Sequence, residues 1–178
     1  MRVITGTARG RKLVAPQGLD TRPTSDMAKE ALFSIIQFEV EGSAVLDLFA
    51  GSGQLGIEAL SRGARSAVFV DALREANQAI IQNLESTQLK ENARVVMMDA
   101  AAFLKTVHDP FDIALLDPPY NKELIDLLLP LLVPCMNPGG VIVCETERDK
   151  TLPETVGIFA TRKEYRYGKA KLTTYRAL

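Results

Sequence analysis

The stretch VLDLFAGSGQLG, residues 45–56, decides the fold class. An apolar, β-rich run passes into a glycine-rich turn and then into an amphipathic segment, so the spacing GxGxxG falls where a strand meets a helix. Glycines at such a turn let the backbone and the N–H groups of the helix start approach a ligand closely. Asp71 ends the next apolar run, about 20 residues on, where a carboxylate can bind ribose hydroxyls. The stretch therefore predicts an adenosine-binding α/β unit and leaves NAD and S-adenosylmethionine both open.

The same alternation continues outward from this stretch. Apolar runs that we expect to be strands cover residues 44–49, 67–71, 94–98, 113–116 and 141–145. Amphipathic runs that we expect to be helices cover residues 53–61, 74–87, 100–107 and 122–132. Alternating strands and helices are typical of parallel strands joined by crossover helices, so the pattern predicts a doubly wound sheet with helices on both faces.

The two ends of the chain follow different patterns. Residues 158–167 and 169–175 are β-rich and meet at Gly168, which predicts a terminal hairpin and brings the expected strands to seven. Residues 24–26, Thr-Ser-Asp, offer cap residues for an upstream helix that packs on the sheet. We expect its apolar stripe to contain Met27, Ala31, Phe33 or Ser34, and Ile35. Before this helix, apolar pairs at 3–4 and 13–14 predict a small N-terminal β-hairpin with exposed basic residues.

Size and composition exclude several classes of protein. The 178 residues suit one domain, in which we expect a basic hairpin extension at 1–20 and a catalytic core at 21–178. The longest apolar run, residues 127–136, contains two prolines and is far shorter than the ~20 residues of a membrane span. No secretory signal is evident, so the cytoplasm is the expected compartment. Cys135 and Cys144 are expected to be reduced and His108 to lie in a loop, and no zinc or other metal spacing is present.

The net charge of −1 conceals a segregation of charge. The first twelve residues contain bases and no acid: Arg2, Arg9, Arg11 and Lys12. Residues 162–178 contain six bases and one acid, Glu164, so the middle of the chain is acidic. Basic ends favour a polyanionic partner such as RNA, although short basic tails can also be merely solvated.

Asp47 distinguishes in part between the two adenosine ligands. It lies in the strand just before the glycines, where a carboxylate complements a cationic amino-acid moiety and would repel the pyrophosphate of a dinucleotide. The alternative is an aspartate that only ties the loop by accepting backbone N–H bonds. A dehydrogenase would also need a further substrate domain, for which this chain has little room.

The tetrad Asp117-Pro118-Pro119-Tyr120 follows the apolar run 113–116. Ligands of open α/β sheets bind at the carboxyl ends of strands, so this tetrad should face the glycine loop. The two prolines stiffen the loop, and the Asp117 carboxylate and the Pro118 carbonyl are both acceptors that match an NH₂ group. Asp117 would hold and deprotonate an exocyclic amine, and Tyr120 would stack on the base that carries it.

These residues belong to longer stretches that resemble a known family. The segments RVITGTARGRKLVAP (2–16), RPTSDMAKEALF (22–33), VLDLFAGSGQLGIEALSRGA (45–64), VVMMDAAAFL (95–104) and DIALLDPPY (112–120) are similar to those of the bacterial enzymes that methylate N2 of one guanine in 16S ribosomal RNA. The resemblance implies a Rossmann-like class I methyltransferase fold with a mostly parallel, seven-stranded sheet and a reversed terminal strand. It also implies S-adenosylmethionine as cofactor, and 16S rRNA in the assembling small ribosomal subunit as partner.

The resemblance also assigns residues to sites. It places the cofactor on Asp47, Phe49, Ala50, Gly51, Gly53, Gly56, Asp71, Asp99 and Ala100. The methionine end lies near Asp47, the ribose at Asp71, where related enzymes often have Glu, and the adenine beside Asp99. Asp117 to Tyr120 hold the target amine. We expect Arg2, Arg9, Arg11, Lys12 and Arg22 to bind RNA, although Arg22 and its neighbours could instead line the methionine pocket or begin a helix.

Other readings of the sequence stay open. Two acceptors serve any planar amine, so an adenine-N6 or a protein-glutamine methyltransferase is the nearest alternative, with Asp rather than Asn in the tetrad favouring guanine. An NAD-dependent oxidoreductase and an RNA-binding module without catalysis are the alternatives from other classes. We expect a monomer with no metal and no membrane contact.

Overall fold

The computed structural model describes residues 1–18, 24–119 and 123–178. Within these ranges one sheet of eight strands has the order β3-β2-β1-β4-β5-β8-β7-β6. The strands are β1 (Ala44–Leu48), β2 (Ser66–Asp71), β3 (Ala93–Met97), β4 (Phe111–Leu116), β5 (Met136–Glu147), β6 (Thr155–Val156), β7 (Phe159–Tyr167) and β8 (Ala170–Ala177). The helices are α1 (Asp26–Ile35), α2 (Gln54–Ser61), α3 (Arg74–Thr87), α4 (Ala100–Thr106) and α5 (Leu124–Leu132), with short 3-10 helices at Lys90–Asn92 and Val133–Cys135.

The sheet has the predicted direction of strands. β3, β2, β1, β4 and β5 are parallel, with a crossover helix between every two of them that are consecutive in the sequence, and β8 is antiparallel to β5. The terminal hairpin is confirmed, since β7 and β8 pair antiparallel around Gly168. The count of seven strands is wrong by one. The additional strand, β6, has only two residues, which pair with the start of β7 and are too few to show a periodic pattern.

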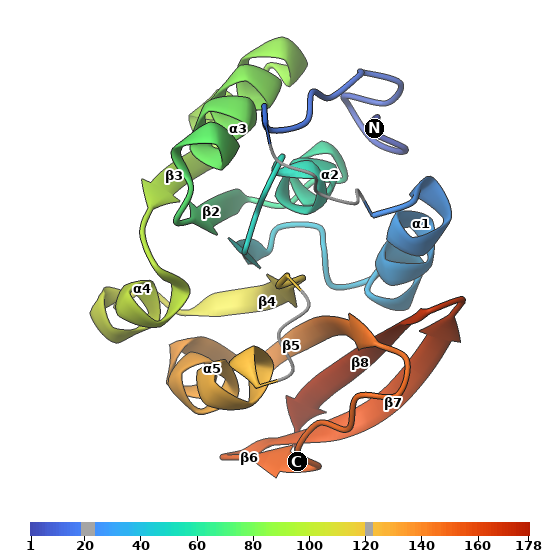
Figure 1. Cartoon of the computed structure of the whole chain (residues 1–178), viewed down its shortest axis with the longest axis vertical. Helices are drawn as coiled ribbons and strands as arrows, with labels where there is room; N and C mark the ends of the chain where they lie inside the picture. The colour runs from blue at the N-terminus through green and yellow to red at the C-terminus, as the bar shows by residue number, and fades with distance from the viewer. Residues whose placement is uncertain (19–23, 120–122) are drawn as a thin grey trace.

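Helices cover both faces of the sheet, as predicted (Figure 1). On one face α1, α2 and α3 pack through residues such as Phe33, Ile57 and Ile80. On the other face α4 and α5 pack through residues such as Phe103 and Leu129. This two-faced burial explains why the central strands are apolar throughout rather than alternating.

The upstream helix α1 forms, but with a different buried stripe from the expected one. Phe33 is buried as expected, but Met27 is 75% exposed, and Leu32 and Ile36, which were not expected in the stripe, are buried. Lys29 of the same helix is also fully buried. The inward face of α1 therefore contains a charged residue that hydrophobic periodicity would place in solvent, and the buried stripe is shifted accordingly.

The N-terminal hairpin is smaller than predicted. It contains one isolated antiparallel bridge, between Arg2 and Lys12, and no regular strand among residues 1–18. Val3 bonds to Arg11 and Gly10 rather than to residues 13–14. In Figure 1 this segment lies over α2, between α1 and α3.

Candidate active site

The glycine loop begins with a sharp change of direction after β1. Phe49 has a positive φ of 70°, a left-handed conformation that is uncommon for a residue other than glycine. The N–H groups of Phe49 and Ala50 both donate to the Val70 carbonyl, at 3.0 Å each. Gly53 then closes the turn by donating to the Ala50 carbonyl at 2.7 Å. The strained residue is held by hydrogen bonds to the neighbouring strand β2, and such strain is concentrated at functional sites.

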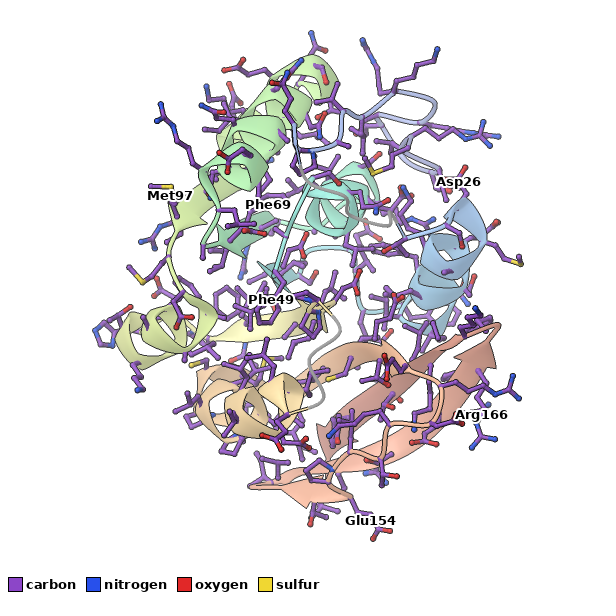
Figure 2. The ribbon with its side chains drawn as sticks, viewed as in Figure 1. Asp26, Phe49, Phe69, Met97, Glu154 and Arg166 are labelled. Atoms are coloured by element: carbon purple, nitrogen blue, oxygen red, sulfur yellow. The ribbon has the colours of Figure 1, made fainter. Side chains whose placement is uncertain are left out.

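The three glycines of the GxGxxG spacing have different surroundings. A Cβ added to Gly56 would lie 2.3 Å from a ring carbon of Phe69, and one added to Gly53 would lie 3.2–3.3 Å from Ile80 and Phe69. Figure 2 shows Phe69 between α2 and α3. Gly51 has a φ of +58° and no atom within 4 Å of an added Cβ. Gly53 and Gly56 therefore serve helix–strand packing, and only Gly51 borders open space for a ligand.

Asp47 is buried beneath this loop, at 2% exposure. One of its oxygens, Oδ2, accepts the backbone N–H of Gly56 at 2.9 Å, which is the loop-tying contact that the sequence left as an alternative. Burial raises the pKa of Asp47 to about 8, with further increases from the nearby Asp117 and Asp71 and an opposing decrease from the Gly56 N–H. The loop-tying contact engages Oδ2 alone.

Asp71 lies at the carboxyl end of β2 and joins two turns. Its Oδ2 accepts the N–H of Gly51 and its Oδ1 accepts the N–H of Leu73, both at 2.9 Å. Its side chain therefore borders Gly51, the glycine next to open space.

Asp99, after β3, is exposed and caps α4 by accepting the N–H of Ala102 at 3.0 Å, and Ala100 is buried as the first residue of α4. The end of β3 is thus adjacent to Asp71, since Met97 pairs with Asp71.

Asp117 follows β4, whose last residue Leu116 is paired with Leu48 on β1. The register places Asp117 beside the start of the glycine loop, as predicted. Its Oδ2 accepts a hydrogen bond of 3.0 Å from the Thr24 hydroxyl. Burial raises the pKa of Asp117, and the Thr24 bond opposes that rise. Pro118 is half-buried and Pro119 is exposed, while Tyr120 lies outside the described residues.

Three carboxylates therefore gather at the ends of neighbouring strands β2, β1 and β4. In residues 1–18, 24–119 and 123–178 no basic side chain forms an ion pair with Asp47, Asp71 or Asp117. Asp117 and Asp71 both raise the pKa of Asp47, as mutual repulsion requires. A positively charged ligand would relieve that repulsion, and a pyrophosphate would increase it.

The N-terminal bases are mostly free of acidic partners. Arg9, Arg11 and Lys12 are exposed and form no ion pair within the described ranges. Arg2 differs, because its Nε lies 3.1 Å from Asp26 at the start of α1. Arg22 lies outside the described residues.

Buried polar residues that the sequence analysis did not select hold the N-terminal segment in place. Glu58 on α2 is fully buried and accepts the N–H groups of Ile4 and Thr5, at 2.9 and 3.0 Å. Asn83 on α3 bonds to both backbone groups of Val14 and donates to the Ser52 carbonyl in the glycine loop. The only sequence signal for these residues is a polar side chain at an apolar position of a helix.

Some basic side chains of the terminal hairpin have partners within the fold, and others are exposed. Lys171 is 4% exposed and is neutralised by Glu164 at 2.7 Å, and Arg162 donates to the Ala177 carbonyl. Arg166 is exposed and projects from the outside of the hairpin (Figure 2). Lys171, one of the six bases of residues 162–178, therefore has a structural role.

The remaining expectations concern metals, cysteines and the single histidine. No group of three or more His, Cys, Asp or Glu side chains within the described part of the chain is arranged to hold a metal ion. Cys135 and Cys144 are free thiols, both buried, and burial raises the pKa of each. His108 is exposed in the loop before β4, as expected. None of the described helices combines the length and apolar character that crossing a membrane requires.

Comparison with known proteins adds evidence of family. A family model described as Conserved hypothetical protein 95 matches residues 1–176. The chain belongs to this family. It is 42% identical to the Bacillus subtilis protein "Putative rRNA methyltransferase YlbH", over 99% of this chain and 98% of that protein. It is 35% identical to "Ribosomal RNA small subunit methyltransferase D" of Escherichia coli K12, over 99% of this chain and 89% of the relative.

A solved structure agrees with the family assignment. "Putative methyltransferase yhhF" from Escherichia coli has a TM-score of 0.89 and 34% identity, and the match covers 99% of this chain and 97% of that one. The class I methyltransferase fold and the family resemblance inferred from the sequence are thereby confirmed.

Proposed function

We propose that this protein transfers a methyl group from S-adenosylmethionine to the exocyclic N2 amine of a guanine in the RNA of the small ribosomal subunit. The observation that carries the proposal is the group of three carboxylates, Asp47, Asp71 and Asp117, at the ends of β1, β2 and β4 beside the open side of Gly51. The names of the family relatives support the reaction and its ribosomal substrate.

The charge of the site suits this cofactor. S-adenosylmethionine has an ammonium and a sulfonium group, and when bound it supplies an electrophilic methyl group. Asp47 is buried, has no basic partner in the described residues and has a pKa raised to about 8, so a cationic ligand beside it would favour its ionised form and be stabilised by it. The pyrophosphate of NAD would add two negative charges to a site that already repels them. Asp71 beside Gly51 suits the ribose, since one carboxylate oxygen has room for more than one donor.

The catalytic role falls to the tetrad that begins at Asp117. Its carboxylate and the Pro118 carbonyl hold the two hydrogens of an amine and turn its lone pair toward the methyl group. When the new N–C bond forms, the methyl–sulfur bond of the bound cofactor would break and leave S-adenosylhomocysteine. One amine proton must then leave, and Asp117 accepts it directly or passes it to water. A carboxylate with a raised pKa suits proton acceptance near neutral pH better than an ordinary one. Tyr120 supplies the face on which the target base stacks.

The identity of the side chain favours guanine over adenine. The edge of guanine that carries N2 also presents N1–H, so both groups are donors. The corresponding edge of adenine presents N6–H₂ as a donor and N1 as an acceptor. An ionised aspartate only accepts, which matches two donors, whereas an asparagine would match a donor and an acceptor. The RNA backbone would lie on the exposed bases Arg9, Arg11 and Lys12, with Arg2 and Arg22 as further candidates for phosphate contact.

Radiolabelled methyl transfer tests this proposal. The substrates are small ribosomal subunits that lack the modification, RNA stripped from them, and large subunits as a negative control. We expect label in the small-subunit RNA, and a loss of at least ~100-fold in Asp117→Asn with little change in S-adenosylhomocysteine affinity. Asp109→Asn, which alters an exposed loop aspartate, is the matched control and should retain full activity. Tight NAD binding, or label in protein alone, would contradict the proposal.

A further inference from the structure

Thr24 makes a contact that helix initiation does not require. It lies two residues before α1, and the cap of that helix is Ser25, whose hydroxyl accepts the N–H of Ala28 at 3.1 Å. The Thr24 hydroxyl instead donates to Asp117 Oδ2 at 3.0 Å, across 93 positions of sequence. The contact joins the segment before α1 directly to the end of β4.

The direction of this hydrogen bond has a chemical consequence. An ionised carboxylate has no hydrogen to give, so the hydroxyl must donate and thereby favours the charged form of Asp117. Burial favours the protonated form of Asp117, and the carboxylates of Asp47 on β1 and Asp71 on β2 lie at the neighbouring strand ends. In the described residues Thr24 is the side chain that donates to Asp117.

The bond also fixes which oxygen remains available. With Oδ2 engaged by Thr24, the orientation of the carboxylate is restrained, and Oδ1 accepts no hydrogen bond from the described residues. We propose that Thr24 is a positioning residue that orients Asp117 and keeps it ionised, so that Oδ1 receives the proton of the target amine. This proposal rests on the methyl transfer proposed above.

Loss of the Thr24 hydroxyl should leave the fold intact, because α1 is held by other contacts. Leu32, Phe33 and Ile36 are buried in the core, and Lys29 donates from the same helix to the Arg2 carbonyl. An effect of Thr24 on the reaction can therefore be separated from an effect on folding.

The test compares Thr24→Val, which keeps the shape and removes the donor, with Thr24→Ser, which keeps the donor. Single-turnover methyl transfer is measured from about pH 5.5 to 9. We expect Thr24→Val to be slower by about tenfold at neutral pH, equivalent to about 1.4 kcal/mol. The defect should shrink at high pH, where Asp117 ionises without help. Thr24→Ser should stay within about threefold of wild type, and S-adenosylhomocysteine affinity should not change in either variant.

Two further measurements make the proposal refutable. In an Asp117→Ala background, Thr24→Val should have no additional effect on the rate, since the acceptor of the Thr24 hydroxyl is gone. Carboxyl-carbon NMR of the free protein, which needs no RNA, should show the Asp117 titration shifted upward by about one pH unit in Thr24→Val. An unchanged titration, or a rate defect that persists without Asp117, would overturn the role of Thr24. Absence of methyl transfer by the wild-type protein would instead overturn the proposed function.

Discussion

Replacement of Gly56 by alanine tests whether the third glycine of the loop is needed for packing. Gly56 lies inside α2, where helix propensity alone predicts that alanine stabilises the protein by about 1 kcal/mol. The structure predicts the opposite sign. The new Cβ would lie 2.3 Å from one Phe69 ring carbon and 2.8 Å from the next, and Phe69 is fully buried on β2.

The expected magnitude follows from these two opposing effects. Overpacking in a core costs about 1 to 3 kcal/mol, and here the upper value applies because the overlap is with a buried ring rather than the end of a flexible chain. After the gain in propensity, about 2 kcal/mol of destabilisation remains. For a protein of this size that loss lowers Tm by about 4 to 8 °C. Displacement of α2 would also lengthen the hydrogen bond from Gly56 to Asp47.

Thermal and urea unfolding, followed by circular dichroism, measure the effect. The matched control is Gly139→Ala, since an added Cβ there has no atom within 4 Å and the glycine has no positive φ. Phe69→Leu introduced together with Gly56→Ala should recover part of the loss, because the smaller side chain removes the overlap. A Gly56→Ala variant as stable as wild type would refute the packing role of Gly56 and would leave ligand binding as the reason for a glycine at this position.

Three further predictions concern charge and stacking. Burial raises the pKa of Asp47 to about 8, so the folded protein holds a proton that the unfolded chain releases near pH 4. The free energy of unfolding should therefore fall as the pH rises between these values, by at most about 1.4 kcal/mol per pH unit. Urea unfolding at several pH values measures this slope, which should be absent in Asp47→Asn. Arg9→Ala with Arg11→Ala should reduce the slope of log K against log salt for RNA binding by about 1.4 to 1.8, and a retained slope would dismiss both as phosphate contacts. Tyr120→Ala should weaken RNA binding by about 1 to 3 kcal/mol while Tyr120→Phe does not, and equal affinities of all three proteins would exclude stacking.

Much of the fold is predictable from the sequence because its signals are local. The apolar runs, the glycine turn and the reversed terminal hairpin each depend on residues close together in the chain. The register of α1 was not predictable, because burial of Lys29 depends on Glu58 of α2, 3.7 Å from its Nζ. The two-residue β6 is too short to have a periodicity at all.

The candidate site was likewise predictable only where it depends on local sequence. Carboxylates at the ends of three strands can be anticipated, because parallel strands bring their carboxyl ends to one edge of the sheet. The contact between Thr24 and Asp117 cannot be anticipated, since no local pattern relates residues 93 positions apart. The different roles of Gly51 and Gly56 also needed the structure, because both match the same motif and only one of them touches Phe69.

Identification of the methylated nucleoside tests the central claim most directly. Small ribosomal subunits that lack the modification are incubated with the protein and methyl-labelled S-adenosylmethionine, and their RNA is digested to nucleosides and analysed by mass spectrometry. The account predicts one labelled product, N2-methylguanosine. Label in N6-methyladenosine would contradict the match between the Asp117 carboxylate and a guanine edge, and its absence from every nucleoside would contradict RNA methylation itself.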